Sequence, residues 1–358
     1  MIKINLKNLL LVVLFLTTVS CQNIHYYWNV STNQIDLLNR RISIEEAKKK
    51  YNFTDEEESK LDLVQDIKKF ALEVLELDID ESVYSSYVEL EKPYVTYLLR
   101  VSSAYELKAY TWNFPFTGTV SYKGFFEKES ALKEAKNFPK EKFDTYVRGV
   151  TAYSTLGWFE DPITSAMLSY SEKDFALTVF HELAHTVLFF KDHIDFNERF
   201  AEFVGRKASI LFYLDREGAE SETVKTMQAE WEDQLLFSSF MVEEYNSLSD
   251  WYKKNKGKVT SKLKNQRLKE IQNRFLTKIA PHLKTNSYQH FPSIPLNNAR
   301  LLSYRSYNYD MKEFEILYNS KEVNQNLSKL IEVCSQFKKS KDPEKSLKQK
   351  VENLLSAK

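Results

Sequence analysis

The chain has 358 residues, of which 43% are hydrophobic and 14% aromatic, so it is long and apolar enough to bury a sizeable core. Its 50 basic and 50 acidic residues cancel, which argues against nucleic acid and against an electrostatically held membrane surface as partners. Two cysteines, Cys21 and Cys334, cannot build the disulfide framework of a small secreted domain, so we expect the core to provide the stability.

Residues 1–20 have the pattern of an export signal. Lys3 and Lys7 precede an apolar run over residues 9–16 that is too short to span a bilayer. The segment ends at Thr18-Val19-Ser20-Cys21, which resembles a bacterial lipobox except that leucine is usual at the place of the threonine. We therefore expect an exported protein held to a membrane by a lipid on Cys21, at the outer membrane in a Gram-negative cell. A cleaved signal without a lipid is the alternative.

Residues 21–358 are expected to form one α+β domain. A capping-box sequence at Thr54 opens a helical pattern over residues 56–77. Residues 84–122 are rich in β-branched and aromatic residues and predict several antiparallel strands, followed by a helix over residues 128–137 and a strand over residues 146–154. The β-rich portion thus covers about residues 80–155.

From Ser171 to about residue 340 the pattern is nearly all helical. Long charged amphipathic helices are predicted over residues 220–254 and 260–283, with Gly218 as the break before the first, and two more helices over residues 312–338. An antiparallel sheet followed by a helical portion, with a histidine-bearing helix where the two meet, is a zincin-like plan.

That helix carries His181-Glu182-Leu183-Ala184-His185 in an apolar segment, with a capping-box sequence at Ser171. At about 100° per residue, His181 and His185 project from nearly the same face and could share a metal ion. Glu182 points roughly 100° away, where it could act on a water at that metal. Because neutral histidines and a glutamate are costly to bury without a binding partner, a purely structural helix is disfavoured. The pattern predicts a catalytic Zn²⁺ site.

The third ligand is expected from a second helix. The metzincin arrangement is excluded, because Leu188 and Lys191 stand where a glycine and a third histidine would be required. Apolar residues recur at helical spacing over residues 196–211, and the connection before them is short. Two helices so connected pack as an antiparallel pair, which would bring Glu198 to the two histidines.

Other roles are open for the acidic residues of this second helix. Glu198 could instead close a capping box with Asp195, and His193 and Glu202 are rival ligands. Glu202 lies one turn after Glu198 and is better suited to accept a hydrogen bond from a zinc-bound histidine and fix its orientation. We assign a supporting role of the same kind to Asn197.

Residues 181–185 and 196–204 together resemble a bacterial family of zinc aminopeptidases, many of them predicted lipoproteins. Three other stretches are similar to the same family: Tyr26-Tyr27-Trp28, residues 153–159 with Asp161-Pro162, and residues 297–301. The resemblance therefore covers almost the whole mature chain. It implies a zincin-like aminopeptidase, and the run at residues 197–201 is similar to the third-ligand segment of the gluzincin aminopeptidases, which implies Glu198 as a ligand.

The hypothesis that follows is zinc-assisted hydrolysis of a peptide or protein substrate, with Glu182 as general base. A tyrosine is expected to stabilise the tetrahedral intermediate. The candidates Tyr304, Tyr307 and Tyr309 follow residues 297–301, and Tyr307 is placed first. An ordinary packing role is the alternative for any of them.

Gly157 and Trp158 lie just upstream of the histidine helix and could belong to an edge strand that pairs with substrate backbone, or to a simple turn. Glu160 and Asp161 could bind a substrate ammonium group, although carboxylates before a proline more often form turns. An endopeptidase of envelope proteins would use the same zinc chemistry. A non-catalytic zinc-binding surface lipoprotein is a third possibility, which the intact Glu182 disfavours because a structural site needs no general base.

Overall fold

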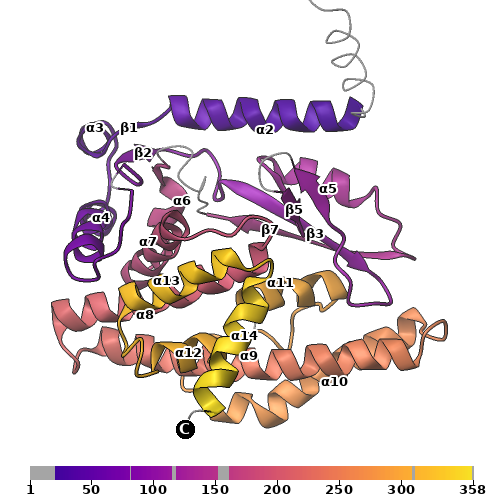
Figure 1. Ribbon diagram of the computed structural model, residues 1–358. Coiled ribbons are helices and arrows are strands. Elements are labelled where there is room, and N and C mark those ends of the chain that lie inside the picture. Colours follow the sequence, from indigo (N-terminus) through magenta and orange to yellow (C-terminus); the bar gives the residue numbers. More distant parts are fainter. Residues whose placement is uncertain (1–20, 81, 115–117, 152–160, 309–310, 357–358) are drawn as a thin grey trace, which may run out of the picture.

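The computed structural model describes residues 21–80, 82–114, 118–151, 161–308 and 311–356 (Figure 1). Helices make up most of this part of the chain, and the strands form three small sheets. The expected α+β class is therefore confirmed. Within the described ranges no helix is both long and apolar enough to cross a membrane.

Three helices precede the strands: α2 (Cys21–Asn39), α3 (Ile44–Lys50) and α4 (Asp55–Glu73). Thr54 caps α4 in a reciprocal capping box with Glu57, as its sequence predicts. The helix ends at Glu73, somewhat before the predicted limit. A second capping box, between Ser43 and Glu46, opens α3 and was not recognised from the sequence.

The predicted antiparallel strands are present. The strands and the one helix of this region are β3 (Thr96–Ser103), β4 (Trp112–Phe114), β5 (Gly118–Val120), β6 (Lys123–Phe125), α5 (Lys128–Ala135) and β7 (Phe143–Val150). The long strand β3 lies between β6 and β7 and pairs antiparallel with both, while β4 and β5 form a hairpin. The strand predicted from residue 146 begins earlier, at Phe143, and is described to Val150.

A second sheet contains a pairing that the sequence did not predict. Its strands are β1 (Ile42–Ser43), β2 (Ser86–Val88) and β8 (Ile163–Thr164), in the order β1-β2-β8. The β2–β8 pair is parallel, with Tyr87 opposite Ile163. Because parallel strands need a long crossover connection, short-range sequence patterns carry no signal for this pair. It holds the segment just before the histidine helix against the N-terminal part of the chain.

The rest of the chain is helical, as predicted. Its helices are α6 (Ser165–Leu168), α7 (Glu172–Val187), α8 (Ile194–Glu217), α9 (Glu222–Lys254), α10 (Ser261–Lys278), α11 (Asn298–Asn308), α12 (Lys312–Tyr318), α13 (Leu327–Ser335) and α14 (Pro343–Ser356). Gly218 ends α8 at a φ of 84°, which confirms the predicted break. The predicted helix over residues 260–283 stops at Lys278 and continues only as a 3-10 turn that contains Pro281.

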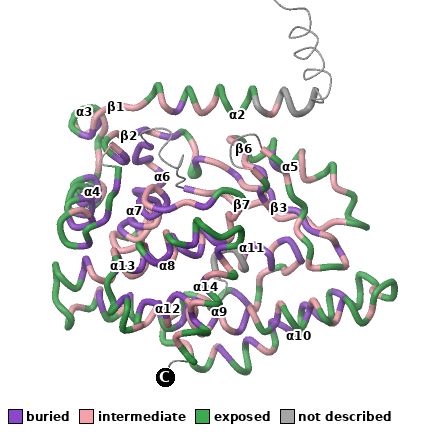
Figure 2. Tube along the Cα trace, viewed as in Figure 1, coloured by how far each residue is buried: buried purple, intermediate pink, exposed green. Residues whose placement is uncertain are grey.

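The two largest apolar clusters hold these elements together. The larger one joins α4, α7, α8 and the C-terminal helices α12 to α14, and its centre contains Phe180, Phe200 and Phe314. The smaller one surrounds Phe237 of α9 and Phe275 of α10. Helix α11 packs on α8 and α9 and on strands β3 and β7, so it connects the helical layer to the sheet. Buried segments accordingly gather along α7 and α8 in the middle of the molecule (Figure 2).

Candidate metal centre

Helix α7 holds the two histidines at a fixed depth in the molecule. Its N-terminus is capped by Ser171, whose hydroxyl accepts a hydrogen bond from the backbone N–H of Asp174. Half of its residues are buried and the rest are partly buried, and Phe180 lies in the larger apolar cluster. His185 is only 7% exposed and Glu182 only 8%. The side chains of Glu182 and His185 are therefore presented inside the protein and not on its surface.

Helix α8 approaches α7 unusually closely at Gly205. A Cβ added at this glycine would lie 2.8 Å from both the backbone nitrogen and the Cα of His181. Only the absence of a side chain allows the two backbones to come this near. Gly205 was missed as a site residue from the sequence, although an isolated glycine inside a helical pattern is a signal of close backbone approach.

The connection between α7 and α8 is held by Asn197. Its side-chain amide donates to the carbonyl of Phe190 at 2.7 Å, and its amide oxygen accepts from the Phe190 backbone N–H at 2.9 Å. Both the oxygen and the nitrogen of the amide thus bond to the backbone of Phe190. Asn197 thus supports the site by holding the turn before α8. We expected its side chain to contact one of the candidate metal ligands, but it bonds to Phe190 instead.

The arrangement brings Glu198 to both histidines. Its Oε2 lies 3.8 Å from His181 Nε2, and its Oε1 lies 4.0 Å from His185 Nε2. One donor atom from each of the three residues falls within 4.8 Å of the other two. No other group of three or more His, Cys, Asp or Glu side chains in the described part of the chain has the spacing to hold a metal ion.

The structure bears on two alternatives from the sequence: a capping box between Asp195 and Glu198, and His193 as a metal ligand. Helix α8 begins at Ile194 with His193 at its N-cap, and His193 makes no side-chain capping bond. Asp195 therefore lies inside the first turn and not at the cap, so the capping-box interpretation of Glu198 is wrong. His193 is not part of the three-residue group.

Glu202 lies on the other nitrogen of His181. Its Oε2 is 3.5 Å from His181 Nδ1, while its Oε1 accepts from Gln234 Nε2 at 2.9 Å and from Arg206 Nη2 at 3.3 Å. Each nitrogen of the imidazole thus faces a different glutamate. Gln234 belongs to α9, and the sequence offered no local sign of its role, because its partner lies far away along the chain.

The buried charges of this group shift one another's pKa values. Burial opposes protonation of His181, but the bond to Glu202 and the charges of the neighbouring glutamates outweigh it and raise the pKa to about 9. Burial also raises the pKa of Glu182, to about 7; the charge of His181 opposes this rise, whereas those of Glu198 and Asp161 add to it. Burial and the charge of His181 lower the pKa of His185 well below its ordinary value.

The donor set fits zinc. Two imidazoles and one carboxylate are the protein ligands of many catalytic zinc sites, which leave a fourth position open. The neighbouring carboxylates raise the pKa of His181, which means that the group favours positive charge at this place. A divalent cation bound between these side chains would supply positive charge of that kind.

The remaining predicted site residues are placed less completely. Asp161 is buried, near enough to Glu182 to affect its pKa, and its backbone carbonyl accepts from Tyr84 N–H at 2.7 Å. Gly157, Trp158 and Glu160 lie outside the described residues, as does Tyr309. Position 307 belongs to α11, but the Tyr307 side chain is likewise outside the description.

Tyr304 occupies a packing position. Its ring contacts those of Phe237 and Phe291, with centroids 5.8 Å away in both cases. It belongs to the smaller apolar cluster, which agrees with the alternative of an ordinary packing tyrosine. Residues 297–301, which contributed to the family resemblance, also make structural contacts: Asn298 donates to the carbonyls of Ser103 and Ala104 and so fixes the start of α11 on the sheet.

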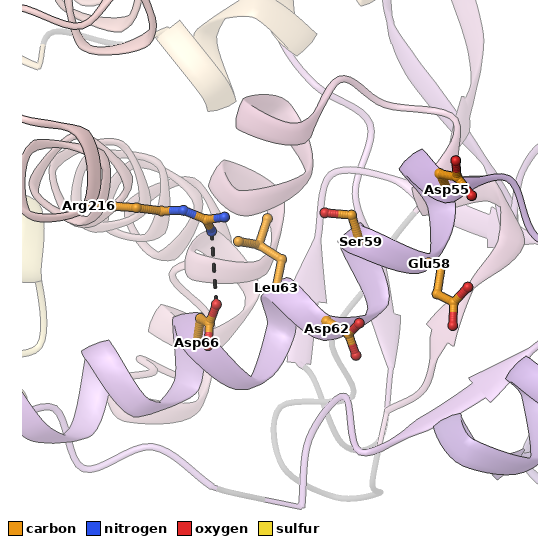
Figure 3. A pocket seen from close by; sticks show the side chains of 7 residues that line it. All are labelled: Asp55, Glu58, Ser59, Asp62, Leu63, Asp66 and Arg216. Atoms are coloured by element: carbon orange, nitrogen blue, oxygen red, sulfur yellow. Dashed lines mark ion pairs between the residues drawn. The ribbon is translucent and has the colours of Figure 1, made fainter.

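A surface pocket of about 350 Å³ lies elsewhere, on α4 (Figure 3). It is lined by Asp55, Glu58, Ser59, Asp62, Leu63, Asp66 and Arg216. Several of its carboxylates have basic partners, since Lys48 pairs with Glu58 and Asp62 and Arg216 pairs with Asp66. None of the residues of the histidine–glutamate group lines it.

Comparison with known proteins identifies the family of the chain. Residues 25–349 match the model of a family described as "Putative aminopeptidase". No curated protein and no solved structure matches the chain. The matched stretch runs from α2 into α14 and contains His181, Glu182, His185 and Glu198. Because it covers well over half of the sequence, the chain belongs to the "Putative aminopeptidase" family.

Proposed function

We propose that the protein is a zinc-dependent peptidase that removes residues from the amino termini of peptides or proteins. The observation that carries the zinc dependence is the convergence of His181, His185 and Glu198, whose donor atoms lie within 4.8 Å of one another. The family description supports peptidase activity and supplies the preference for amino termini. A zincin-like domain that follows a signal over residues 1–20 is part of the same proposal.

In this proposal His181, His185 and Glu198 hold the ion. Zinc bound there would polarise the scissile carbonyl and lower the pKa of a coordinated water. Hydrolysis also requires a general base that lies beside the metal ligands without being one of them. Glu182 meets this requirement, because it directly follows His181 on the helix and is nearly fully buried. Its carboxylate takes the proton from the attacking water and passes it to the nitrogen of the leaving amine.

Glu202 acts as a positioning residue for His181. Its Oε2 faces Nδ1 of that ring at 3.5 Å, so a hydrogen bond there fixes the proton on Nδ1 and leaves the lone pair of Nε2 free for a metal. Gln234 and Arg206 in turn hold the other oxygen of Glu202. The chain of contacts from α9 through α8 to α7 keeps the imidazole from rotating.

Substrate contacts are proposed for residues other than the metal ligands. Tyr307 of α11 is our candidate for the donor that stabilises the tetrahedral intermediate, and Gly157 with Trp158 for the edge that pairs with substrate backbone. Asp161 is the candidate for binding the substrate ammonium group, since its buried carboxylate already acts on Glu182. These assignments make the protein an exopeptidase; without an ammonium-binding carboxylate, the same chemistry would serve an endopeptidase.

The test of the mechanism is Glu182→Gln, compared with Glu220→Gln at a fully exposed position of the α8–α9 connection. The Glu182 variant is expected to bind one equivalent of zinc and to lose hydrolysis, because glutamine cannot accept the proton. The Glu220 variant is expected to keep both. Wild-type turnover by the Glu182 variant would exclude the proposed base.

The position of cleavage in the substrate is tested by digestion of a peptide library with the zinc-bound protein. The products are identified by mass spectrometry. Release of single residues from amino termini is the expected outcome. Internal cuts would support the endopeptidase, and no cuts with zinc bound would support a non-catalytic zinc-binding surface lipoprotein.

We also propose that the protein is exported and anchored in a membrane by a lipid on Cys21, at the outer membrane if the cell is Gram-negative. The lipobox-like residues 18–21 support this assignment. Cells supplied with radiolabelled palmitate are expected to incorporate the label into the parent protein and not into Cys21→Ser. Equal labelling of the two proteins, or no label in the parent, would contradict the anchor.

A further inference from the structure

Helix α2 presents two large apolar side chains to solvent. Trp28 is 69% exposed and Ile35 is 56% exposed. The helix runs along one edge of the molecule, above the strands in the view of Figure 1, and no other element of the described residues lies beyond it there. Whether these two side chains form a functional surface depends on how they lie relative to each other and to the rest of the helix.

The opposite side of α2 is packed against the rest of the protein, and this packing holds Trp28 and Ile35 towards solvent. Near its end, Leu37 is buried in a small cluster with Val88 and Val95. Near its start, the ring of Tyr26 lies 5.6 Å from that of Phe125, with Lys123 Nζ above it at 4.3 Å. The helix therefore cannot turn Trp28 and Ile35 inward without breaking contacts at both ends.

The spacing of the two exposed residues puts them on one stripe. Seven residues on an α-helix fall only about 20° short of two full turns, so positions 28 and 35 point the same way. Two small polar residues, Ser31 and Thr32, lie between them on this side and are also exposed; the Thr32 hydroxyl donates to the carbonyl of Trp28 at 2.8 Å. Position 21 lies seven residues before Trp28 and falls on the same side of the helix. It is the position at which we expect the lipid.

This stripe carries no charge suited to a charged partner. The segment Cys21–Asn39 contains no lysine or arginine. Its one acidic residue, Asp36, lies 3.5 Å from Arg40 in an ion pair. An apolar, uncharged stripe that contains tryptophan matches the interfacial region of a lipid bilayer, where tryptophan is favoured because its ring is amphipathic.

We propose that the outer side of α2, defined by Trp28 and Ile35, docks on a lipid bilayer. The helix lies in the plane of the membrane surface, and both side chains enter the interfacial region beside the lipid chain of the anchor. Because α2 begins at Cys21, no linker separates the anchor from this surface. The peptidase is therefore held in one orientation with its α2 side on the membrane, and does not swing on a flexible tether. The zinc site plays no part in the inference.

The experiment uses the chain from residue 21 onward with Cys21→Ser, so that no lipid contributes. Its partition onto phosphatidylcholine vesicles is measured by co-sedimentation, with and without Trp28→Ser and Ile35→Ser together. The parent is expected to bind, and the double variant to bind more weakly by roughly tenfold for each side chain removed from the apolar phase. Because the stripe is uncharged, high salt is expected to leave binding unchanged.

The matched control is a second pair of exposed apolar residues, Leu263→Ser and Leu276→Ser on α10, which are 46% and 48% exposed. Helix α10 lies on the opposite side of the molecule from α2 in Figure 1, so this pair is expected to leave partition unchanged. The proposal is overturned if the parent does not bind vesicles, if the Trp28/Ile35 variant binds as well as the parent, or if the control pair weakens binding equally. If Trp28→Ser with Ile35→Ser lowers the unfolding midpoint, vesicle binding of the conservative variant Trp28→Phe with Ile35→Leu is measured as well. That variant must retain binding if the proposal is right.

Discussion

Gly205 on α8 lies directly against the backbone of His181 on α7. The space that a Cβ would need at this glycine is taken by the His181 nitrogen and Cα, both 2.8 Å away. Glu198 and Glu202 precede Gly205 by two turns and one turn on the same side of α8, so the close approach brings both carboxylates to the histidines. The geometry of the site is therefore set by the close packing of α7 and α8, and not by the sequence of residues 181–185 alone.

Gly205→Ala is expected to weaken both the fold and the zinc site. The added methyl group overlaps backbone atoms that cannot move aside, so the helices must separate, at a cost of about 1–3 kcal/mol of unfolding free energy. Denaturant unfolding and zinc competition with a chelator measure the two effects. Gly124→Ala is the control, because its Cβ would meet only Leu98 Cδ2, at 3.7 Å. Equal behaviour of the two variants would show that the close approach does not matter.

Gln234→Leu is expected to weaken zinc binding by about 10- to 100-fold while most of the stability is retained. The glutamine holds the Glu202 oxygen that does not face His181, so its loss lets the carboxylate and then the imidazole move. Gln272→Leu is a control of the same chemistry. Gln272 is also buried but donates to the carbonyls of Phe291 and Ile294, so its removal should lower stability and leave zinc affinity alone. A Gln234 variant with wild-type zinc affinity would exclude the positioning role.

Zinc removal is expected to abolish hydrolysis and to lower the thermal midpoint, and added zinc to restore both. A ligand that binds only the folded state stabilises it by about 2.7 kcal/mol when present at one hundred times its dissociation constant. Differential scanning calorimetry with and without zinc measures the shift. His185→Ala should remove the zinc-dependent shift, whereas His282→Ala at an exposed position should keep it. A shift that survives His185→Ala would mean that zinc stabilises the fold at another place.

Arg199→Ala is expected to destabilise the protein by about 3–5 kcal/mol, because it leaves two carboxylates without their buried partner. Arg199 has a fully buried side chain that pairs with Glu313 of α12 at 3.2 Å and with Glu344 of α14. It thus ties α8, the helix that carries Glu198, to the C-terminal helices α12 and α14. Chemical denaturation measures the loss.

The control for Arg199 is Arg216→Ala. Arg216 is partly exposed and lies 3.9 Å from Asp66 at the pocket on α4 (Figure 3). An ion pair of this kind is expected to contribute less than about 1 kcal/mol. Similar losses for the two variants would mean that burial of Arg199 does not determine its contribution.

The sequence by itself determined the features that depend on neighbours along the chain. The capping by Ser171 and the shared face of His181 and His185 follow from helical geometry within a few residues. The short connection between two amphipathic helices was also sufficient to place Glu198 near these histidines, because antiparallel neighbours leave few other arrangements.

Only the tertiary structure decided which residues support that motif. Gln234 reaches Glu202 across 32 positions of sequence, Arg199 reaches Glu344 across 145, and β2 pairs with β8 in parallel; none of these contacts has a periodic or local signature. The same holds for the outward direction of Trp28 and Ile35, which follows from the packing on the other side of α2. Such contacts are fixed by how whole helices and strands fill a common core, and that is a property of the assembled fold.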